Sequence, residues 1–192
     1  IKNVLKELKK LARRTKSLPM LSLTHGQPET TTTLGKELAV FISRIERELV
    51  LINEINLLAK FSGATGSYAA HKAAFPKANW SVFAKKFIKR LGLEQSPITS
   101  QIEPGDSIAR LLHSYVRINN IFSDFSLDMW LYISRNIFVQ KNVSGEVGSS
   151  TMPHKINPIF FENAEGNLDV ANNNFSFLAS RITKSRLQRD LS

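Results

Sequence analysis

Three polar connectors between apolar segments carry the residue types that could do chemistry in this chain. Their candidate side chains are Thr24, His25, Gln27, Gln101, Ser149, Ser150, Lys155 and Asn157. Imidazole and hydroxyl groups can move a proton near neutral pH, and an ammonium group with backbone N–H groups can hold an anion. The set therefore predicts proton transfer on a substrate that carries carboxylates.

The third connector, residues 144–158, has the most distinctive sequence, SGEVGSSTMPHKINP. Its two glycines permit backbone angles that other residues avoid, and its two prolines restrict the path of the chain. Pro158 suits the first position of a following helix, because its missing N–H has no partner to lose there. A loop that leads into a helix N-terminus is suited to holding an anion.

The sequence predicts neither a metal nor a cofactor. The 4 histidines show no ligand spacing and no acidic cluster joins them. The glycines at 63 and 66 could cradle a phosphate, but no strand is expected before them, so a dinucleotide fingerprint is rejected. The chain has no cysteine, which excludes disulfides and fits a reducing compartment such as the cytoplasm. No apolar run approaches the roughly 20 residues of a membrane helix.

The chain is strongly basic, with 26 Lys and Arg against 16 Asp and Glu, a net charge of +10. Three interpretations compete: a nucleic-acid surface, attraction of a polyanionic small substrate, or an excess that arises because the chain is part of a longer protein. The basic residues are spread along predicted helices and are not interleaved with exposed aromatic residues. We therefore expect no nucleic-acid partner, and keep a basic helical nucleic-acid-binding module as a remote alternative.

Hydrophobic periodicity predicts an all-α fold built from long, nearly parallel helices in a bundle. The helices are expected at residues 2–17, 34–60, 80–91, 106–137 and 159–180, and no strand is expected. Thr32 or Thr33 should cap the second helix, Gly92 should end the third and Asp106 should cap the fourth. The second helix has a seam with steps of four and three residues: Leu34, Leu38, Phe41, Ile45, Ile52 and Ile55.

Apolar residues also lie off these seams, which predicts association between subunits. They include Leu49, Leu51, Leu112 and Ile121. A helix that is apolar on more than one stripe must bury both. The chain begins inside a periodic helix without an initiator Met, so we expect residues 1–192 to be a single helical domain cut from a longer protein.

Residues 148–158 match, at every fixed position, the signature of the fumarase/aspartase superfamily, Gly-Ser-Ser-x-Met-Pro-x-Lys-x-Asn-Pro. Residues 22–28, SLTHGQP, are similar to the second conserved block of its adenylosuccinate lyase branch, although Leu23 stands where these enzymes usually carry arginine. The resemblance continues through residues 34–37, 63–66, 99–106, 161–168 and 185–191. The last two blocks favour this branch, and the alternative is argininosuccinate lyase or another fumarate-releasing member of the superfamily.

The resemblance implies a lyase that eliminates fumarate from adenylosuccinate to give AMP, and cleaves the succinylated aminoimidazole carboxamide ribotide in the same way. It implies Ser149 as the base and His25 as the acid, and Ser150 remains a competitor for the base. The substrate-binding residues that it implies are Thr24, Gln27, Gln101, Ser150, Met152, Lys155, Asn157 and Arg189. It further implies a homotetramer in which four subunits form one central helical bundle and share active sites. The isolated chain should associate in this way and yet be inactive, because the flanking domains of the family, with a further histidine block and part of the nucleotide pocket, would be missing.

Overall fold

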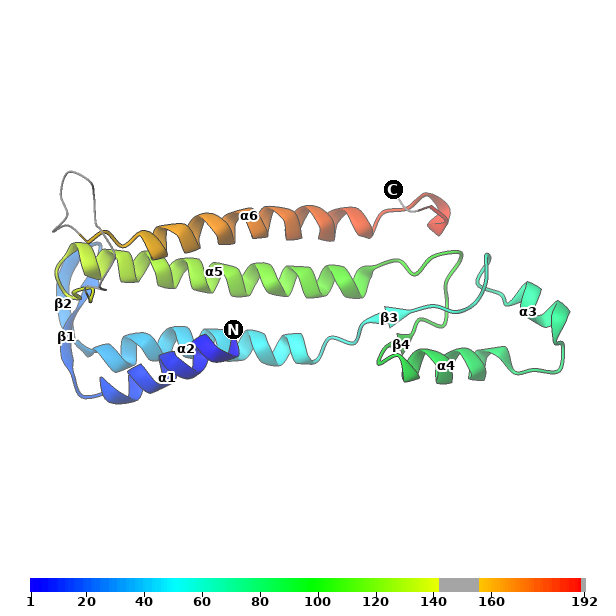
Figure 1. The fold of residues 1–192 in the computed structure, drawn as a ribbon, viewed down its shortest axis with the longest axis horizontal. Helices are drawn as coiled ribbons and strands as arrows, with labels where there is room; N and C mark the ends of the chain where they lie inside the picture. Colours follow the sequence, from blue (N-terminus) through cyan, green and yellow to red (C-terminus); the bar gives the residue numbers. More distant parts are fainter. Residues whose placement is uncertain (142–155, 191–192) are drawn as a thin grey trace. The chain divides into compact units, whose positions relative to one another are not determined.

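The computed structural model describes residues 1–141 and 156–190, and these form two compact units. Unit 1 contains Ile1–Val50 and Ile118–Leu168, and unit 2 contains Leu51–Arg117 and Asp169–Ser192. The α-helices of the described residues are α1 (Lys2–Arg14), α2 (Leu34–Asn53), α3 (Ala69–Ala74), α4 (Trp80–Arg90), α5 (Asp106–Ser134) and α6 (Ile159–Ile182) (Figure 1). This content confirms the predicted all-α class.

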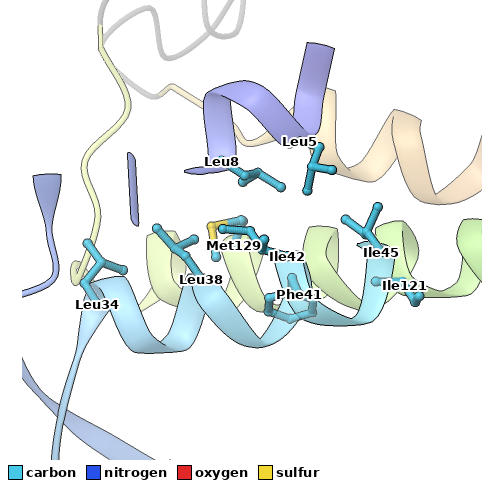
Figure 2. Close-up of a cluster of buried hydrophobic side chains, with 9 residues drawn as sticks. All are labelled: Leu5, Leu8, Leu34, Leu38, Phe41, Ile42, Ile45, Ile121 and Met129. Atoms are coloured by element: carbon cyan, nitrogen blue, oxygen red, sulfur yellow. The ribbon is translucent and has the colours of Figure 1, made fainter. Parts of the chain in front are cut away.

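Unit 1 is held together by a hydrophobic core between α1, α2 and α5 (Figure 2). The core consists of Leu5, Leu8, Leu34, Leu38, Phe41, Ile42, Ile45, Ile121 and Met129. Leu38 and Ile45 are only 1% and 0% exposed, so the predicted seam of α2 is confirmed at its first four positions. Burying each large apolar side chain contributes about 1.5–3 kcal/mol. The assignment of Ile121 to an outer stripe was wrong, because this side chain lies in the core of its own chain.

The expectation that the chain has no strand was also wrong. Strands β1 (Pro19–Thr24) and β2 (Gln27–Thr33) pair antiparallel, with an irregularity between Leu21 and Leu23 (Figure 1). The consecutive threonines at 30–33 favour a strand because their branched side chains suit a pleated surface. The predicted threonine cap of the next helix, α2, is confirmed, since the Thr33 hydroxyl accepts a hydrogen bond from the Lys36 backbone N–H at 3.2 Å.

The helices α1 and α2 approach each other closely at Gly35. The Gly35 N–H donates to the Thr15 carbonyl at 3.0 Å, and a Cβ at residue 35 would lie 2.5 Å from the Ala12 carbonyl oxygen. Both helices are shorter than predicted. Helix α1 ends at Arg14 instead of residue 17 and α2 ends at Asn53 instead of residue 60, because the chain after each helix enters strand pairing instead of continuing the helical ladder.

In unit 2, strand β3 (Leu58–Ala59) pairs parallel with β4 (Glu94–Gln95). Helix α4 starts with an Asn79 cap, whose side-chain oxygen accepts from the Val82 N–H at 3.1 Å, and the predicted stop at Gly92 has a φ of 77°. Asp106 is the first residue of α5 instead of its cap. The Glu103 carboxylate accepts from the Gly105 N–H at 2.8 Å just before that helix.

A search for a helix with the length and apolarity needed to cross a bilayer finds none in residues 1–141 and 156–190.

Candidate active site

The tip of the β1–β2 hairpin brings together Thr24, His25 and Gln27. Thr24 and Gln27 pair directly across the two strands, which leaves His25 and Gly26 as a two-residue loop. Both loop residues have positive φ values, 50° and 75°, as expected for the primed turns that suit the twist of a hairpin. Glycine adopts this conformation freely and histidine adopts it more readily than most residues. The side chains of Thr24, His25 and Gln27 are exposed and so are accessible to a substrate.

Arg135, a residue that the sequence did not single out, contacts the His25 turn. Its guanidinium Nη1 donates to the Gly26 carbonyl at 2.8 Å. A Cβ at residue 26 would lie 3.0 Å from Nη2 of the same arginine, so the guanidinium lies close against the glycine. Arg135 directly follows α5 and carries no recognisable motif. Only the fold places it beside the turn.

Of the signature at residues 148–158, the structure describes only residues 156–158, which lie just before α6. Ser149, Ser150, Met152 and Lys155 lie outside the described residues, whereas Asn157 is described and half-buried. The side-chain amide of Gln140 donates to the Ile156 carbonyl at 3.3 Å. This contact brings the chain before the loop next to the chain after it. Helix α6 begins at Ile159, one residue later than a Pro158 start would give.

Unit 2 holds Gln101 on a connector that is tied to residues 60–66. The Lys60 ammonium donates to three backbone carbonyls, at 2.6 Å to Gly63, 2.7 Å to Ser100 and 2.6 Å to Gln101. The hydroxyls of Ser62 and Thr99 are 3.0 Å apart. Burial lowers the pKa of Lys60 below its ordinary value of 10.5, because desolvation penalises the charged amine. Lys60 is another residue that the sequence analysis missed.

The segment that contains Arg189 is bonded to the same connector. The Ile102 N–H donates to the Gln188 carbonyl at 3.3 Å, and the Ser100 hydroxyl donates to that carbonyl as well. Gln188 and its neighbour Leu187 have positive φ values, 57° and 55°, a conformation that costs a non-glycine residue free energy and must be held by its surroundings. The structure thus places the backbone segments of Gln101 and Arg189 side by side, although 88 positions separate them in the sequence.

A turn closed by Asp190 shapes the segment that carries Arg189. The Asp190 carboxylate accepts from the Ser185 hydroxyl and from the Arg186 N–H, each at 2.7 Å. These hydrogen bonds hold the pKa of Asp190 below its ordinary value of 3.8, with the Ser185 bond as the largest cause. Arg186 pairs with the same carboxylate at 2.6 Å, whereas the Arg189 side chain is exposed.

A pocket of about 610 Å³ lies beside Gln101 in unit 2, lined by residues 60–64, His71 and residues 101–103. The His71 ring packs edge-on against Phe61 at 5.2 Å and Trp80 at 4.9 Å between ring centroids. Residues 1–141 and 156–190 contain no group of three or more His, Cys, Asp or Glu side chains that could hold a metal. The polar side chains of the pocket lining are Lys60, Ser62, His71, Gln101 and Glu103, which can orient a polar substrate.

The described candidates therefore form two groups. One group is the hairpin tip with Thr24, His25 and Gln27 in unit 1, together with Asn157 before α6. The other is the paired connectors of Gln101 and Arg189 in unit 2. The first group contains an imidazole, and the second contains a side-chain amide and a guanidinium. The candidate residues thus lie in the connectors between helices.

The family is shown by a comparison with protein-family models. A model described as "Lyase" matches residues 1–171. The chain belongs to this family of lyases, in agreement with the fumarase/aspartase signature at residues 148–158.

The curated relatives that the chain matches here are all named adenylosuccinate lyase. The chain is 49% identical over 184 residues to adenylosuccinate lyase from Escherichia coli (strain K12), covering 96% of this chain and 40% of that enzyme. It is 50% identical over 192 residues to adenylosuccinate lyase from Dictyostelium discoideum, covering 98% of this chain and 41% of that enzyme. For the enzyme of the same name from Vibrio cholerae the identity is 48% over 192 residues, covering 100% and 42%. The chain thus spans about two fifths of the length of these curated relatives.

Proposed function

We propose that the complete protein containing this chain cleaves adenylosuccinate to AMP and fumarate, and cleaves the succinylated aminoimidazole carboxamide ribotide in the same way. The observation that supports this most is the identity of about one half, over nearly the whole chain, to relatives named adenylosuccinate lyase. The complete signature at residues 148–158 supports the same assignment, because it supplies the residue types that a fumarate elimination needs.

In the proposed reaction, Ser149 takes a proton from the carbon beside a substrate carboxylate. The electron pair of that C–H bond forms the new C=C bond of fumarate, and the C–N bond breaks with its pair going to nitrogen. His25 protonates the departing nitrogen. Serine is a poor base in water, so its alkoxide needs stabilisation by N–H groups of the loop and by the ammonium of Lys155. Ser150 remains the alternative base.

The carboxylate beside the reacting carbon gains negative charge in the transition state. Lys155 would neutralise that charge and Asn157 would hold the other carboxylate oxygen, since both donate hydrogen bonds. The position of Asn157 two residues before α6 supports this role, because a helix N-terminus favours negative charge. His25 is suited to the acid role, because imidazole titrates near neutral pH. Its exposed position at the hairpin tip supports access to a substrate.

The remaining candidates would bind the rest of the substrate. Thr24, Gln27 and Gln101 would orient the succinyl part, Met152 would contact it from the signature loop, and Arg189 would contact the AMP part or its phosphate. The bonds from Ser100 and Ile102 to Gln188 support a joint role for Gln101 and Arg189, because they place the two segments together. No cofactor enters the proposed reaction.

We further propose a homotetramer in the cytoplasm whose active sites take the His25, Gln101 and Ser149 connectors from different chains. Exposed apolar side chains support association: Val40, Val50, Phe160 and Phe177 are 43%, 57%, 67% and 65% exposed. Closed symmetric assembly is the usual way to bury such faces.

The substrate is tested by adding adenylosuccinate or argininosuccinate to the complete protein and measuring fumarate release. We expect fumarate with adenylosuccinate and none with argininosuccinate. Fumarate release from argininosuccinate alone would identify the protein as an argininosuccinate lyase instead. A protein inactive on both, but able to shift nucleic acid in a gel with strong salt dependence, would support the nucleic-acid alternative.

A further inference from the structure

The Lys60 ammonium is directed at three backbone carbonyls. An ammonium group has three N–H donors, and Lys60 uses them on the carbonyls of Gly63, Ser100 and Gln101 at 2.6–2.7 Å. Hydrogen bonds from a charged donor are short and are stronger than neutral ones. The Lys60 side chain is also partly buried, where such bonds are screened less by water.

The three carbonyls belong to two segments that are far apart in the sequence. Gly63 follows Lys60 closely, whereas Ser100 and Gln101 lie about 40 residues further on, just before α5. Lys60 therefore acts as a crosslink between the two segments. The same segments meet at Gly66, where a Cβ would lie 1.7 Å from the Thr99 carbonyl oxygen, so residue 66 must be glycine for this approach.

The crosslink acts on the backbone of Gln101 itself. The Gln101 carbonyl is one of its three acceptors, and both neighbours of Gln101 are bonded to Gln188. The backbone of residues 100–102 is therefore fixed from two sides, by Lys60 and by Gln188. The Gln101 side chain itself stays exposed beside the pocket that Lys60 also lines.

We propose that Lys60 is a positioning residue: its ammonium fixes the backbone of residues 100–101 so that the Gln101 side chain is held ready for the substrate. Partial burial lowers the pKa of Lys60, which agrees with an amine that is partly withdrawn from solvent. The kinetic part of this inference rests on the function proposed above, whereas the crosslink itself does not depend on the identity of the substrate.

The kinetic test compares Lys60→Met, Gln101→Ala and the double variant in the complete protein, with adenylosuccinate as substrate. Because Gln101 would bind the succinyl part in the ground state and the transition state alike, we expect each single variant to raise KM about tenfold or more with a smaller change in kcat. Since Lys60 acts through Gln101, the double variant should be no worse than Gln101→Ala alone, within about twofold. If the increase in KM of the double variant equals the product of the increases of the two single variants, the proposal is overturned.

Two further variants separate positioning from charge and from folding. Lys60→Arg keeps the charge, but a planar guanidinium does not direct three donors from one point at three carbonyls, so KM should rise as it does in Lys60→Met. Lys72 is exposed on α3, and Lys72→Met should leave KM unchanged. A wild-type KM in Lys60→Arg would show that charge alone suffices and would overturn the proposal.

A readout without substrate keeps the crosslink testable on its own. In hydrogen exchange of the complete protein, Lys60→Met should speed exchange of the amides at residues 99–103 at least about tenfold, because local opening governs exchange. Core amides of α2 should exchange as in the wild type. Unchanged exchange at residues 99–103 would overturn the inference, even if adenylosuccinate is cleaved. Faster exchange in a protein that does not cleave adenylosuccinate would support the crosslink and remove only the proposed function.

Discussion

His25 occupies a backbone conformation that most residues avoid, with a φ of 50° directly before Gly26 at 75°. The hairpin register and the Arg135 contact with Gly26 hold it there. The residue type and neighbours of His25 made it a candidate from sequence alone. The turn at His25 was not predicted, because it depends on strand pairing, and neither was the contact of Arg135 with Gly26, because 109 positions separate these two residues.

Ser149→Ala in the complete protein should nearly abolish turnover while adenylosuccinate still binds, because the lost hydroxyl acts in the transition state. A general base typically contributes at least roughly a hundredfold. Steady-state kinetics with a separate binding measurement tests this expectation. Retention of more than about a tenth of the wild-type rate would show that another residue is the base, with Ser150 as the first candidate.

The pKa of Asp190 should lie below 3.8, and Ser185→Ala should move it upward toward that value, because the Ser185 hydroxyl is the largest cause of the shift. A carboxyl with a lowered pKa stabilises the folded turn above its ordinary pKa, and this stabilisation is lost as pH falls through the lowered value. NMR titration of the side-chain carboxyl measures the shift. Ser180→Ala, near the end of α6, is the control and should leave the pKa of Asp190 unchanged.

At the scale of helices and strands, the periodicity of apolar residues predicted more of the structure than the helix or strand propensity of single residues did. The seam of α2 and the Gly92 stop were confirmed, because they depend on burial and on local backbone angles. The β1–β2 hairpin was missed, since the run of threonines suits a helix cap as well as a strand and only long-range pairing decides between them. Lys60 was missed for a similar reason: it is one of 26 Lys and Arg residues, and its role depends on carbonyls brought to it by the fold.

Gly35→Ala should destabilise unit 1, because its Cβ would lie 2.5 Å from the Ala12 carbonyl oxygen and 2.6 Å from the Lys16 Cα. Forcing such a contact typically costs about 1–3 kcal/mol. Gly166→Ala is the matched control: within this chain its Cβ would meet nothing within 4 Å, and alanine favours a helix by about 0.5–1 kcal/mol over glycine. Thermal unfolding should give a lower midpoint for Gly35→Ala only. Equal midpoints for the two variants would contradict the close approach of α1 and α2.

At the scale of the whole molecule, the candidates belong to two units: the hairpin tip and Asn157 to unit 1, and the connectors of Gln101 and Arg189 to unit 2. We propose that an active site takes such groups from different chains of a tetramer. Sequence predicted the residue types of the candidate site, but a site shared between chains would depend on subunit packing, which the pattern of one chain does not specify.

Mixing two inactive variants of the complete protein tests this central proposal most directly. His25→Gln and Ser149→Ala should each be nearly inactive alone, because each lacks one of the two proton-transfer groups. After dissociation and reassembly in equal amounts, about a quarter of the sites should contain an intact histidine and an intact serine from different chains, if chains combine at random in a closed oligomer. Fumarate release from adenylosuccinate should then recover to about a quarter of the wild-type rate. A reassembled mixture as inactive as its two parents would contradict the shared site.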